Sequence, residues 1–478
     1  MATTHRLRPR EVTLHALDAA RLEPLIGRMR MARLEAAAEA TEATLAGRSV
    51  IKVNSTANGG GVAEMLSTLV SYSLGAGIDT HWHVIQGDPA FFEITKRIHN
   101  RLYGSPGDGG PLGDAERKHY EAVLRANGRR LIPLVRPGGI VMIHDPQPAG
   151  LLQAAKLAGA RVIWRCHVGR DHPNEWTEQA WTFLRRYVED ADAYVVSRRD
   201  FAAPWMDRAR VTVMAPSIDP FSAKNEPMSR RNVVRTLAFA GLLAGDGDPP
   251  EAPFTRRDGS PGWITRQADT LGTGAAPPGA PLVVQVSRWD RIKDMPGVLT
   301  SFAEHVDPGL GAHLLLAGPA VSGVADDGEA ADALEECMAV WRALPRAARG
   351  RVHLACVPMD DPDENASIIN AVQRHAAIVV QKSLAEGFGL TVSEAMWKAR
   401  PVVASRVGGI VDQITHGRQG LLIDDPLDLA SFGQAVTQLL RDPEEAEAMG
   451  RRGRARVQRA FLADRHLMQY DTLLQRLS

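Results

Sequence analysis

The chain contains two series of short apolar runs that alternate with helical patterns, and a polar stretch separates the two series. In the first series the apolar runs lie at 48–53, 81–86, 139–144, 161–166 and 193–197. In the second they lie at 281–287, 313–318, 351–357, 377–381, 401–405 and 420–423, and helical patterns occupy 296–306, 329–344, 364–375, 390–399 and 427–441. Apolar strands that alternate with helices are typical of parallel sheets buried on both faces. The pattern therefore predicts an α/β fold with two parallel-sheet domains.

Domain boundaries are predicted where this alternation stops and restarts. We expect an N-terminal domain at 1–216 and a C-terminal domain at 217–455, with residues 242–280 as a linker or insertion because that segment is rich in Gly and Pro. Residues 456–478 form a predicted helix that packs back across the domains. Open parallel sheets bind ligands beyond the carboxyl ends of their strands, so two such sheets predict an interdomain cleft.

The composition excludes several classes of partner. Lys plus Arg equals Asp plus Glu at 56 each, and this balance argues against a broad nucleic-acid or acidic-membrane surface. The three cysteines lie far apart and form neither a disulfide framework nor a metal cluster. No window approaches the roughly 20 apolar residues of a membrane span, and no signal peptide is evident. We expect a cytoplasmic protein without a bound metal.

The first candidate site is the stretch VNSTANGGGVAEML, Val53 to Leu66, in which three glycines separate an apolar run from a helical pattern. Glycines allow main-chain N–H groups to approach a ligand closely, and the positive end of the following helix favours an anion. Gly60 and Gly61 are therefore candidate phosphate-binding residues. A simple strand-to-helix turn is an equally good explanation of this stretch taken alone.

Two cations follow directly on an apolar run in SRWDRIKD. Arg288 and Lys293 can clamp a diphosphate, because Arg offers a bidentate fork and Lys a point charge. Together they would offset about two negative charges on a leaving group. The alternative is a solvated loop with ordinary surface cations.

Two glutamates stand eight residues apart in EGFGLTVSEAMWKARP. Glu386 lies in a predicted loop, whereas Glu394 lies in the first turns of a helix whose free N–H groups include those of Gly389 and Leu390. Carboxylates accept hydrogen bonds from sugar hydroxyls, and backbone N–H groups suit phosphate oxygens. This combination fits a nucleotide sugar better than a dinucleotide. Alternatively, Glu394 is an acid favourably placed near a helix N-terminus and Glu386 is a solvated loop charge.

Polar residues also follow two predicted strands of the N-terminal domain. Asp145, Gln147 and His167 occur in IHDPQPAG and WRCHVG, and the carboxyl ends of parallel strands share one edge of a sheet. We expect them to bind a hydroxylated ligand. Asn174 and Trp176 in HPNEW could extend this pocket, although the same residues suit a helix start with an aromatic anchor.

Taken together, these motifs resemble retaining glycosyltransferases of family 4, and within it the trehalose glycosyltransferring synthases. The resemblance rests on the three glycines at 59–61, on Arg288 with Lys293 and on Glu386 with Glu394. It also rests on the blocks FFEITKRIHNRLYG, IHDPQPAGLL, WRCHVG, VSRWDRIKDMPGVL and QKSLAEGFGLTVSEAMWKARPVV, which span residues from about 50 to 425. The resemblance implies a GT-B fold, in which two Rossmann-like domains face a cleft.

The resemblance also implies a role for each site residue. Gly60 and Gly61 would face the donor diphosphate, Arg288 and Lys293 would stabilise it as it departs, and Glu394 would hold the ribose hydroxyls. The implied donor-binding set is Gly60, Gly61, Arg288, Lys293, Gly389, Leu390 and Glu394. The implied acceptor-binding set is Asp145, Gln147, His167, Asn174 and Trp176. The implied catalytic set is Asp145, His167, Arg288, Lys293 and Glu386, in which Glu386 would contact the donor glucose.

The activity implied is transfer of glucose from UDP-glucose or ADP-glucose to free glucose, which gives trehalose reversibly and needs no cofactor. Such a hexosyltransferase acts on small molecules and can form a homodimer. A retaining trehalose phosphorylase, with inorganic phosphate in place of the diphosphate, is the nearest alternative. A non-catalytic sensor of sugar nucleotides is the alternative from another class.

Overall fold

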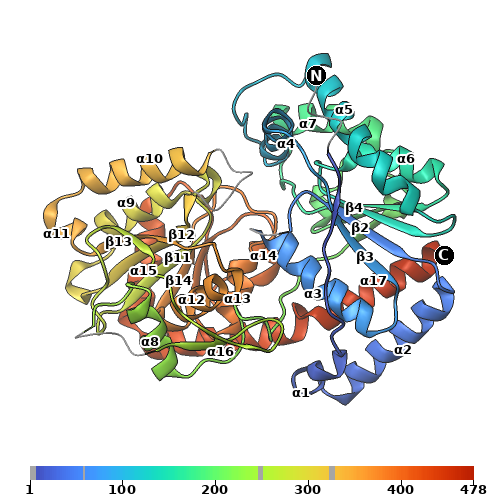
Figure 1. The fold of residues 1–478 in the computed structure, drawn as a ribbon. Helices are drawn as coiled ribbons and strands as arrows, with labels where there is room; N and C mark the ends of the chain where they lie inside the picture. Colours follow the sequence, from blue (N-terminus) through green and yellow to red (C-terminus); the bar gives the residue numbers. More distant parts are fainter. Residues whose placement is uncertain (1–6, 58–59, 246–250, 322–328) are drawn as a thin grey trace. The chain divides into compact units, whose positions relative to one another are not determined.

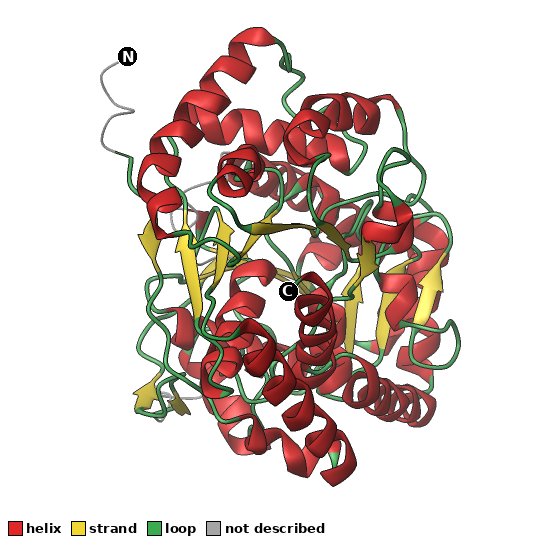
Figure 2. Cartoon of the chain, turned by 90° about the vertical axis from the view of Figure 1, so that its right-hand side faces the viewer, coloured by secondary structure: helices red, strands yellow, loops and turns green. Residues whose placement is uncertain are grey.

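The computed structural model describes residues 7–57, 60–245, 251–321 and 329–478, and these form two compact units (Figure 1). Unit 1 extends to Ser217 and includes Glu386–Phe388 and Phe461–Ser478, whereas unit 2 comprises Ile218–Ala385 and Gly389–Ala460. In each unit helices surround a seven-stranded sheet (Figure 2). The predicted α/β fold with two Rossmann-like domains is confirmed.

Unit 1 is built on a sheet of order β1-β3-β2-β4-β5-β6-β7, in which only β1 is antiparallel to its neighbour. Its strands are β1 Arg10–Glu11, β2 Val50–Asn54, β3 Thr80–Val84, β4 Ile140–His144, β5 Arg161–Cys166, β6 Ala193–Val196 and β7 Val211–Val213. Strands β2 and β4 are buried along their whole length, as expected for a sheet covered on both faces. Strands β1 and β7, which the sequence pattern did not predict, are edge strands of two and three residues.

The helices of unit 1 are α1 Glu23–Ile26, α2 Arg28–Leu45, α3 Gly61–Gly75, α4 Pro89–Leu102, α5 Asp114–Leu131, α6 Leu152–Leu157, α7 Glu175–Val188 and α17 Ala463–Leu477. Local chemistry sets where they begin. Helix α4, for example, starts at Pro89 after Asp88, whose side chain accepts a hydrogen bond from Phe91 N at 2.9 Å. The last helix, α17, packs against α2 within this unit (Figure 1).

Unit 2 is built on a sheet of order β10-β13-β12-β11-β14-β15-β16, in which only β10 is antiparallel to its neighbour. Its strands are β10 Asp269–Gly272, β11 Leu282–Val286, β12 His313–Pro319, β13 Val352–Val357, β14 Ile378–Gln381, β15 Val402–Ser405 and β16 Leu421–Ile423. Strands β8 Pro253–Thr255 and β9 Pro261–Trp263 form a separate antiparallel pair. The described part of the predicted linker 242–280 therefore contains three short strands.

The helices of unit 2 are α8 Arg230–Phe239, α9 Met295–His305, α10 Ala330–Ala343, α11 Arg346–Arg349, α12 Pro362–His375, α13 Leu390–Trp397, α14 Ile410–Gln413, α15 Leu429–Arg441 and α16 Pro443–Ala460. Helices α9, α10 and α15 pack together, whereas α8 packs on α12 and α13 on α16. Within the described ranges, every helix is too short or too polar to cross a lipid bilayer.

Candidate active site

The carboxyl edge of the unit 1 sheet brings Asp145 and His167 together. Strands β4 and β5 are parallel with His144 opposite Arg165, so the residues that follow them lie side by side. Asp145 Oδ1 accepts a hydrogen bond from His167 N at 2.7 Å. Asp145 has a φ of 66°, a left-handed conformation that Asp adopts more readily than most residues. Burial raises the pKa of its carboxyl to about 7.

A second polar layer lies behind this edge, and its residues Lys52 and Arg165 were not predicted to belong to the site. His144 and Arg165 have no exposed surface and Lys52 only 4%. The rings of His144 and His167 stack at an interplanar angle of 10°, and Arg165 Nε donates to His167 Nε2 at 3.4 Å. Burial lowers the pKa of both histidines well below the ordinary value, and it lowers the pKa of Lys52 to about 8. The only sequence signal was a cation inside each of two apolar strands.

Helix α17 completes this layer with polar residues. His466 has no exposed surface, and its Nδ1 lies 3.0 Å from Ser217 Oγ. The Lys52 ammonium lies 4.5 Å from the centre of the Tyr470 ring, a cation–π contact. Residues 456–478 were predicted to pack back across the domains, and in the structure α17 packs within unit 1 through a face that is partly polar.

The segment Glu386–Phe388 lies against the same edge of unit 1. A Cβ atom on Gly387 would lie 2.6 Å from the His167 carbonyl oxygen and 2.9 Å from the Tyr103 hydroxyl, so only glycine fits there. Glu386 beside it is 7% exposed, and Phe388 packs on Phe461 with ring centres 5.6 Å apart. The segment that carries Glu386 therefore lies beside His167. Glu386 and Glu394 were predicted to lie around one small volume. Because Gly389 and the following residues belong to unit 2, this stays a prediction.

The remaining candidates of unit 1 differ in how far their polar groups are engaged. Gly60 precedes α3 without a side-chain cap, and no heavy atom of the described structure lies within 4 Å of a Cβ built on it, so its backbone is open to a ligand. Gly59 lies outside the described residues. Asn174 caps α7 through Thr177 N at 3.1 Å and donates to Gly104 O at 2.9 Å, which is a structural role.

Gln147 and Trp176 are both half-buried. The Trp176 ring faces the Arg101 guanidinium at 5.3 Å. Gln147 lies on the loop after β4, and Tyr120 of α5 holds this loop in place. The Tyr120 hydroxyl donates to Pro146 O at 2.7 Å and accepts from Gly150 N at 3.0 Å.

In unit 2 the two cations stand on the loop that joins β11 to α9. Arg288 donates to Asp290 at 3.1 Å, and the Lys293 backbone is fixed by the Gln285 amide, which donates to Lys293 O at 2.9 Å. Both side chains are half-buried. Buried Lys382 forms an ion pair with Asp294, which caps α9. The loop is therefore held from both ends.

The segment that carries Gly389, Leu390 and Glu394 follows the neighbouring strand, β14. Gly389 has a φ of 83° and begins α13 without a side-chain cap, which leaves the first N–H groups of the helix available. The Glu394 carboxylate is 2% exposed, and its Oε1 lies 3.7 Å from Lys224 Nζ. Its Oε2 is buried and has no hydrogen-bond partner among the described residues. Such an atom calls for a donor from a ligand or from water.

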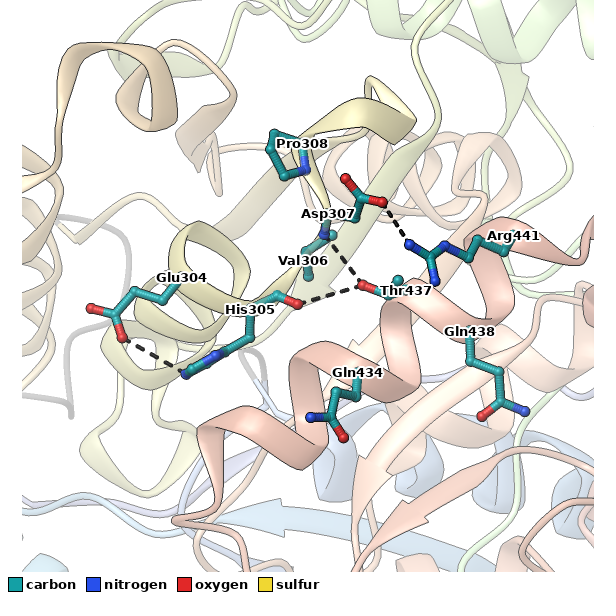
Figure 3. A pocket seen from close by; sticks show the side chains of 9 residues that line it. All are labelled: Glu304, His305, Val306, Asp307, Pro308, Gln434, Thr437, Gln438 and Arg441. Carbon is teal, nitrogen blue, oxygen red and sulfur yellow. Dashed lines mark hydrogen bonds and ion pairs between the residues drawn. The ribbon is translucent and has the colours of Figure 1, made fainter.

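A cavity of about 550 Å³ in unit 2 contains none of the predicted site residues (Figure 3). It lies between the end of α9 and the outer face of α15, and the ion pair of Asp307 with Arg441 at 2.7 Å crosses its rim. Since α9 leads from the carboxyl end of β11 to the start of β12, this cavity lies at the opposite edge of the sheet from Arg288 and Glu394. Among the described residues, no group of His, Cys, Asp and Glu is arranged to hold a metal ion.

Known proteins with similar sequences identify the family. Residues 52–203 match the family model described as trehalose synthase, N-terminal domain, and residues 351–456 match glycosyl transferases group 1. A trehalose synthase of Pyrococcus horikoshii is 32% identical over 95% of this chain and 95% of its own, and one of Rubrobacter xylanophilus is 36% identical over 88% and 89%. The chain belongs to the trehalose synthase family. This confirms the resemblance and the prediction that the chain is a glycosyltransferase.

More distant proteins share the fold or part of the sequence. The trehalose-phosphate synthase (UDP-forming) of Burkholderia xenovorans has a TM-score of 0.65 at 14% identity, and the match covers 90% of this chain and all of that one. This likeness supports the GT-B fold alone. A trehalose phosphorylase of Pleurotus sajor-caju is 27% identical over 77% of this chain and 50% of its own length.

Proposed function

We propose that this glycosyltransferase moves glucose from a nucleoside diphosphate glucose, UDP-glucose or ADP-glucose, to free glucose and forms trehalose with retention, in a reversible reaction. The observation that carries the proposal is the hydrogen bond between Asp145 and His167 at the carboxyl edge of the unit 1 sheet, where the segment that carries Glu386 lies against His167. Three polar groups from separate segments suit a ligand with several hydroxyls. The relatives named as trehalose synthases support glucose as that ligand.

Residues of unit 2 would bind the nucleotide. The unpartnered oxygen of Glu394 is suited to accept hydrogen bonds from ribose hydroxyls. Arg288 and Lys293, with the first N–H groups of α13 at Gly389 and Leu390, suit the diphosphate. Gly60 and Gly61 of unit 1 offer further backbone N–H groups at the start of α3.

In the proposed reaction the bond from the donor's anomeric carbon to the diphosphate oxygen breaks. A bond to the acceptor's anomeric hydroxyl oxygen forms on the same face, and the hydroxyl proton passes to the leaving diphosphate oxygen. Arg288 and Lys293 would stabilise the charge that develops on the diphosphate, and Glu386, Asp145 and His167 would position the sugars. Because the pKa of His167 lies well below its ordinary value, His167 binds hydroxyls as a neutral group.

The phosphorylase alternative is favoured by the resemblance to the Pleurotus enzyme. Such a phosphorylase would use the same glutamates and cations with inorganic phosphate in place of the diphosphate, so dependence on a nucleotide donor is what separates the two reactions. The test is product analysis after incubation with glucose and, separately, UDP-glucose, ADP-glucose or α-glucose 1-phosphate. Trehalose from a nucleotide donor alone supports the proposal. Trehalose from glucose 1-phosphate alone establishes the phosphorylase, and no product from any donor leaves the sensor as the better hypothesis.

A further inference from the structure

Arg165 is buried, and no acidic side chain of the described residues forms an ion pair with it. It has no exposed surface, its Nη2 donates to Met214 O at 2.7 Å, and its Nη1 has no partner among the described residues. A buried cation without a carboxylate at its side is costly for the folded state, so its position calls for a reason beyond packing. The reason lies in its other contact, from Arg165 Nε to His167 Nε2 at 3.4 Å.

A guanidinium N–H can only donate, so the ring nitrogen that receives it must carry a lone pair. We propose that Arg165 is a positioning residue that fixes His167 as the neutral tautomer with its proton on Nδ1. His167 then offers one N–H donor to the sugar-binding edge and cannot act as an acid. The proposal deepens the proposed function, because it states which hydrogen bond His167 can give to a sugar hydroxyl oxygen.

The surroundings of His167 agree with this assignment. His144 Nδ1 lies 3.2 Å from the same His167 Nε2, and as a donor it would reinforce the same tautomer. Protonation of His167 would set Nε2–H against Arg165 Nε–H, in a place where His144 and His466 are also kept neutral by burial. Among the residues that the structure describes, the acidic group in contact with His167 is Asp145, and its Oδ1 accepts from the His167 backbone N–H.

The direct test is ¹⁵N NMR of histidine-labelled protein without substrate, with the His167 signals assigned by their loss in His167→Asn. The expected spectrum shows a protonated Nδ1 and an unprotonated Nε2 for His167, unchanged between about pH 5 and 8. In Arg165→Met the signals should shift toward the other tautomer or the cation. A protonated Nε2 in the wild-type protein overturns the proposal, and this holds whether or not the enzyme makes trehalose.

Kinetics provide a second measurement. We expect Arg165→Met to lower kcat by roughly 10- to 100-fold, the value of one hydrogen bond near a charged group, and to add a pH-dependent limb near the ordinary histidine pKa. Arg165→Lys keeps the charge without the Nε donor and should behave as Arg165→Met does. His144→Phe keeps the stacked ring and the Arg165 contact, so it should keep the tautomer. A flipped tautomer in His144→Phe with no change in Arg165→Met would assign the role to His144 instead.

The matched control is Arg351→Met, which removes a partly buried arginine of unit 2 that donates to Ala312 O and lies over Phe302. It should change neither the His167 signals nor the pH profile. Equal loss of activity in both arginine variants, with the His167 spectrum unchanged in each, would show that Arg165 matters only for folding.

Discussion

Replacement of Glu394 by glutamine should weaken binding of the nucleotide donor without lowering the stability of the fold. The carboxylate is 2% exposed, its Oε2 has no hydrogen-bond partner in the described structure, and its nearest cation, Lys224, lies at 3.7 Å. If Oε2 accepts a ribose hydroxyl, the neutral amide of the Glu394→Gln variant loses one charge-assisted hydrogen bond, worth about 2–3 kcal/mol. That corresponds to a fall of roughly 30- to 150-fold in kcat/KM for the nucleotide donor.

The same substitution should leave the fold intact. An incompletely bonded buried carboxylate contributes little to stability, because its desolvation offsets its attraction to Lys224. We therefore expect the free energy of unfolding of Glu394→Gln to lie within about 1 kcal/mol of the wild-type value. Urea unfolding would measure it, and the donor's kcat/KM would be followed by release of the nucleoside diphosphate.

Glu364 offers a matched control in the same unit. It is also 2% exposed, but its oxygens accept from Thr265 N, from Arg266 N at 2.8 Å and from the Arg266 guanidinium. Glu364→Gln breaks this ion pair and should cost about 2–3 kcal/mol of stability, with no effect on the donor's kcat/KM in the folded protein. The reasoning is refuted if Glu394→Gln loses as much stability as Glu364→Gln and keeps the donor's kcat/KM within about twofold of wild type.

Four further substitutions test other parts of the site. Glu386→Gln and Lys293→Ala should each lower kcat by about 100-fold or more without a change in Tm, as loss of a group that stabilises the transition state does, and near-wild-type rates in both would contradict the assigned site. Asp145→Asn should keep the fold because Asn also adopts positive φ, and should flatten the pH dependence of Tm. Burial raises the pKa of Asp145 from 3.8 in the unfolded chain to about 7 in the folded state. Between these two pH values the folded state therefore binds more protons than the unfolded chain, so the contribution of Asp145 to stability falls as the pH rises from 3.8 to about 7. A wild-type pH profile of Tm in Asp145→Asn would refute this assignment. Tyr120→Phe leaves Gly150 N without its partner and Pro146 O with the Ala149 N–H at 3.4 Å, which should cost about 1–3 kcal/mol in urea unfolding and raise the acceptor KM. An unchanged KM would show that the loop after β4 does not bind the acceptor.

The sequence predicted the strands that are apolar and central. The run PLVVQVS became β11, and RVIWRC became β5 with the predicted bounds, because continuous apolar runs have no stable alternative to burial in a covered sheet. Strands β8, β9 and β10 were missed, since each has three or four residues and includes Pro or Gly. What stabilises them is tertiary, such as Arg256 with Asp361 at 2.7 Å.

The candidate site was predicted in part for a similar reason. Residues that follow strands, such as Asp145 and His167, are visible because the carboxyl edge of a parallel sheet can be located from the pattern alone. Arg165 and His466 could not be predicted. No sequence pattern distinguishes a functional cation within an apolar strand, or a functional histidine in an amphipathic helix, from an ordinary one. At Asn174 the structure supports the alternative of a helix start, because its side chain caps α7, and its contact with a ligand stays a prediction.

The polar layer behind the unit 1 sheet is itself an argument for function. Lys52, His144, Arg165 and His466 are all less than 5% exposed, and burial lowers the pKa of each. A core selected for stability alone would replace them with apolar side chains, since buried charges and unpartnered polar atoms destabilise the folded state. Natural chains retain such groups chiefly where activity depends on them. The layer lies directly behind Asp145 and His167. The buried polar groups that destabilise the fold are therefore next to the residues that we expect to hold the sugars.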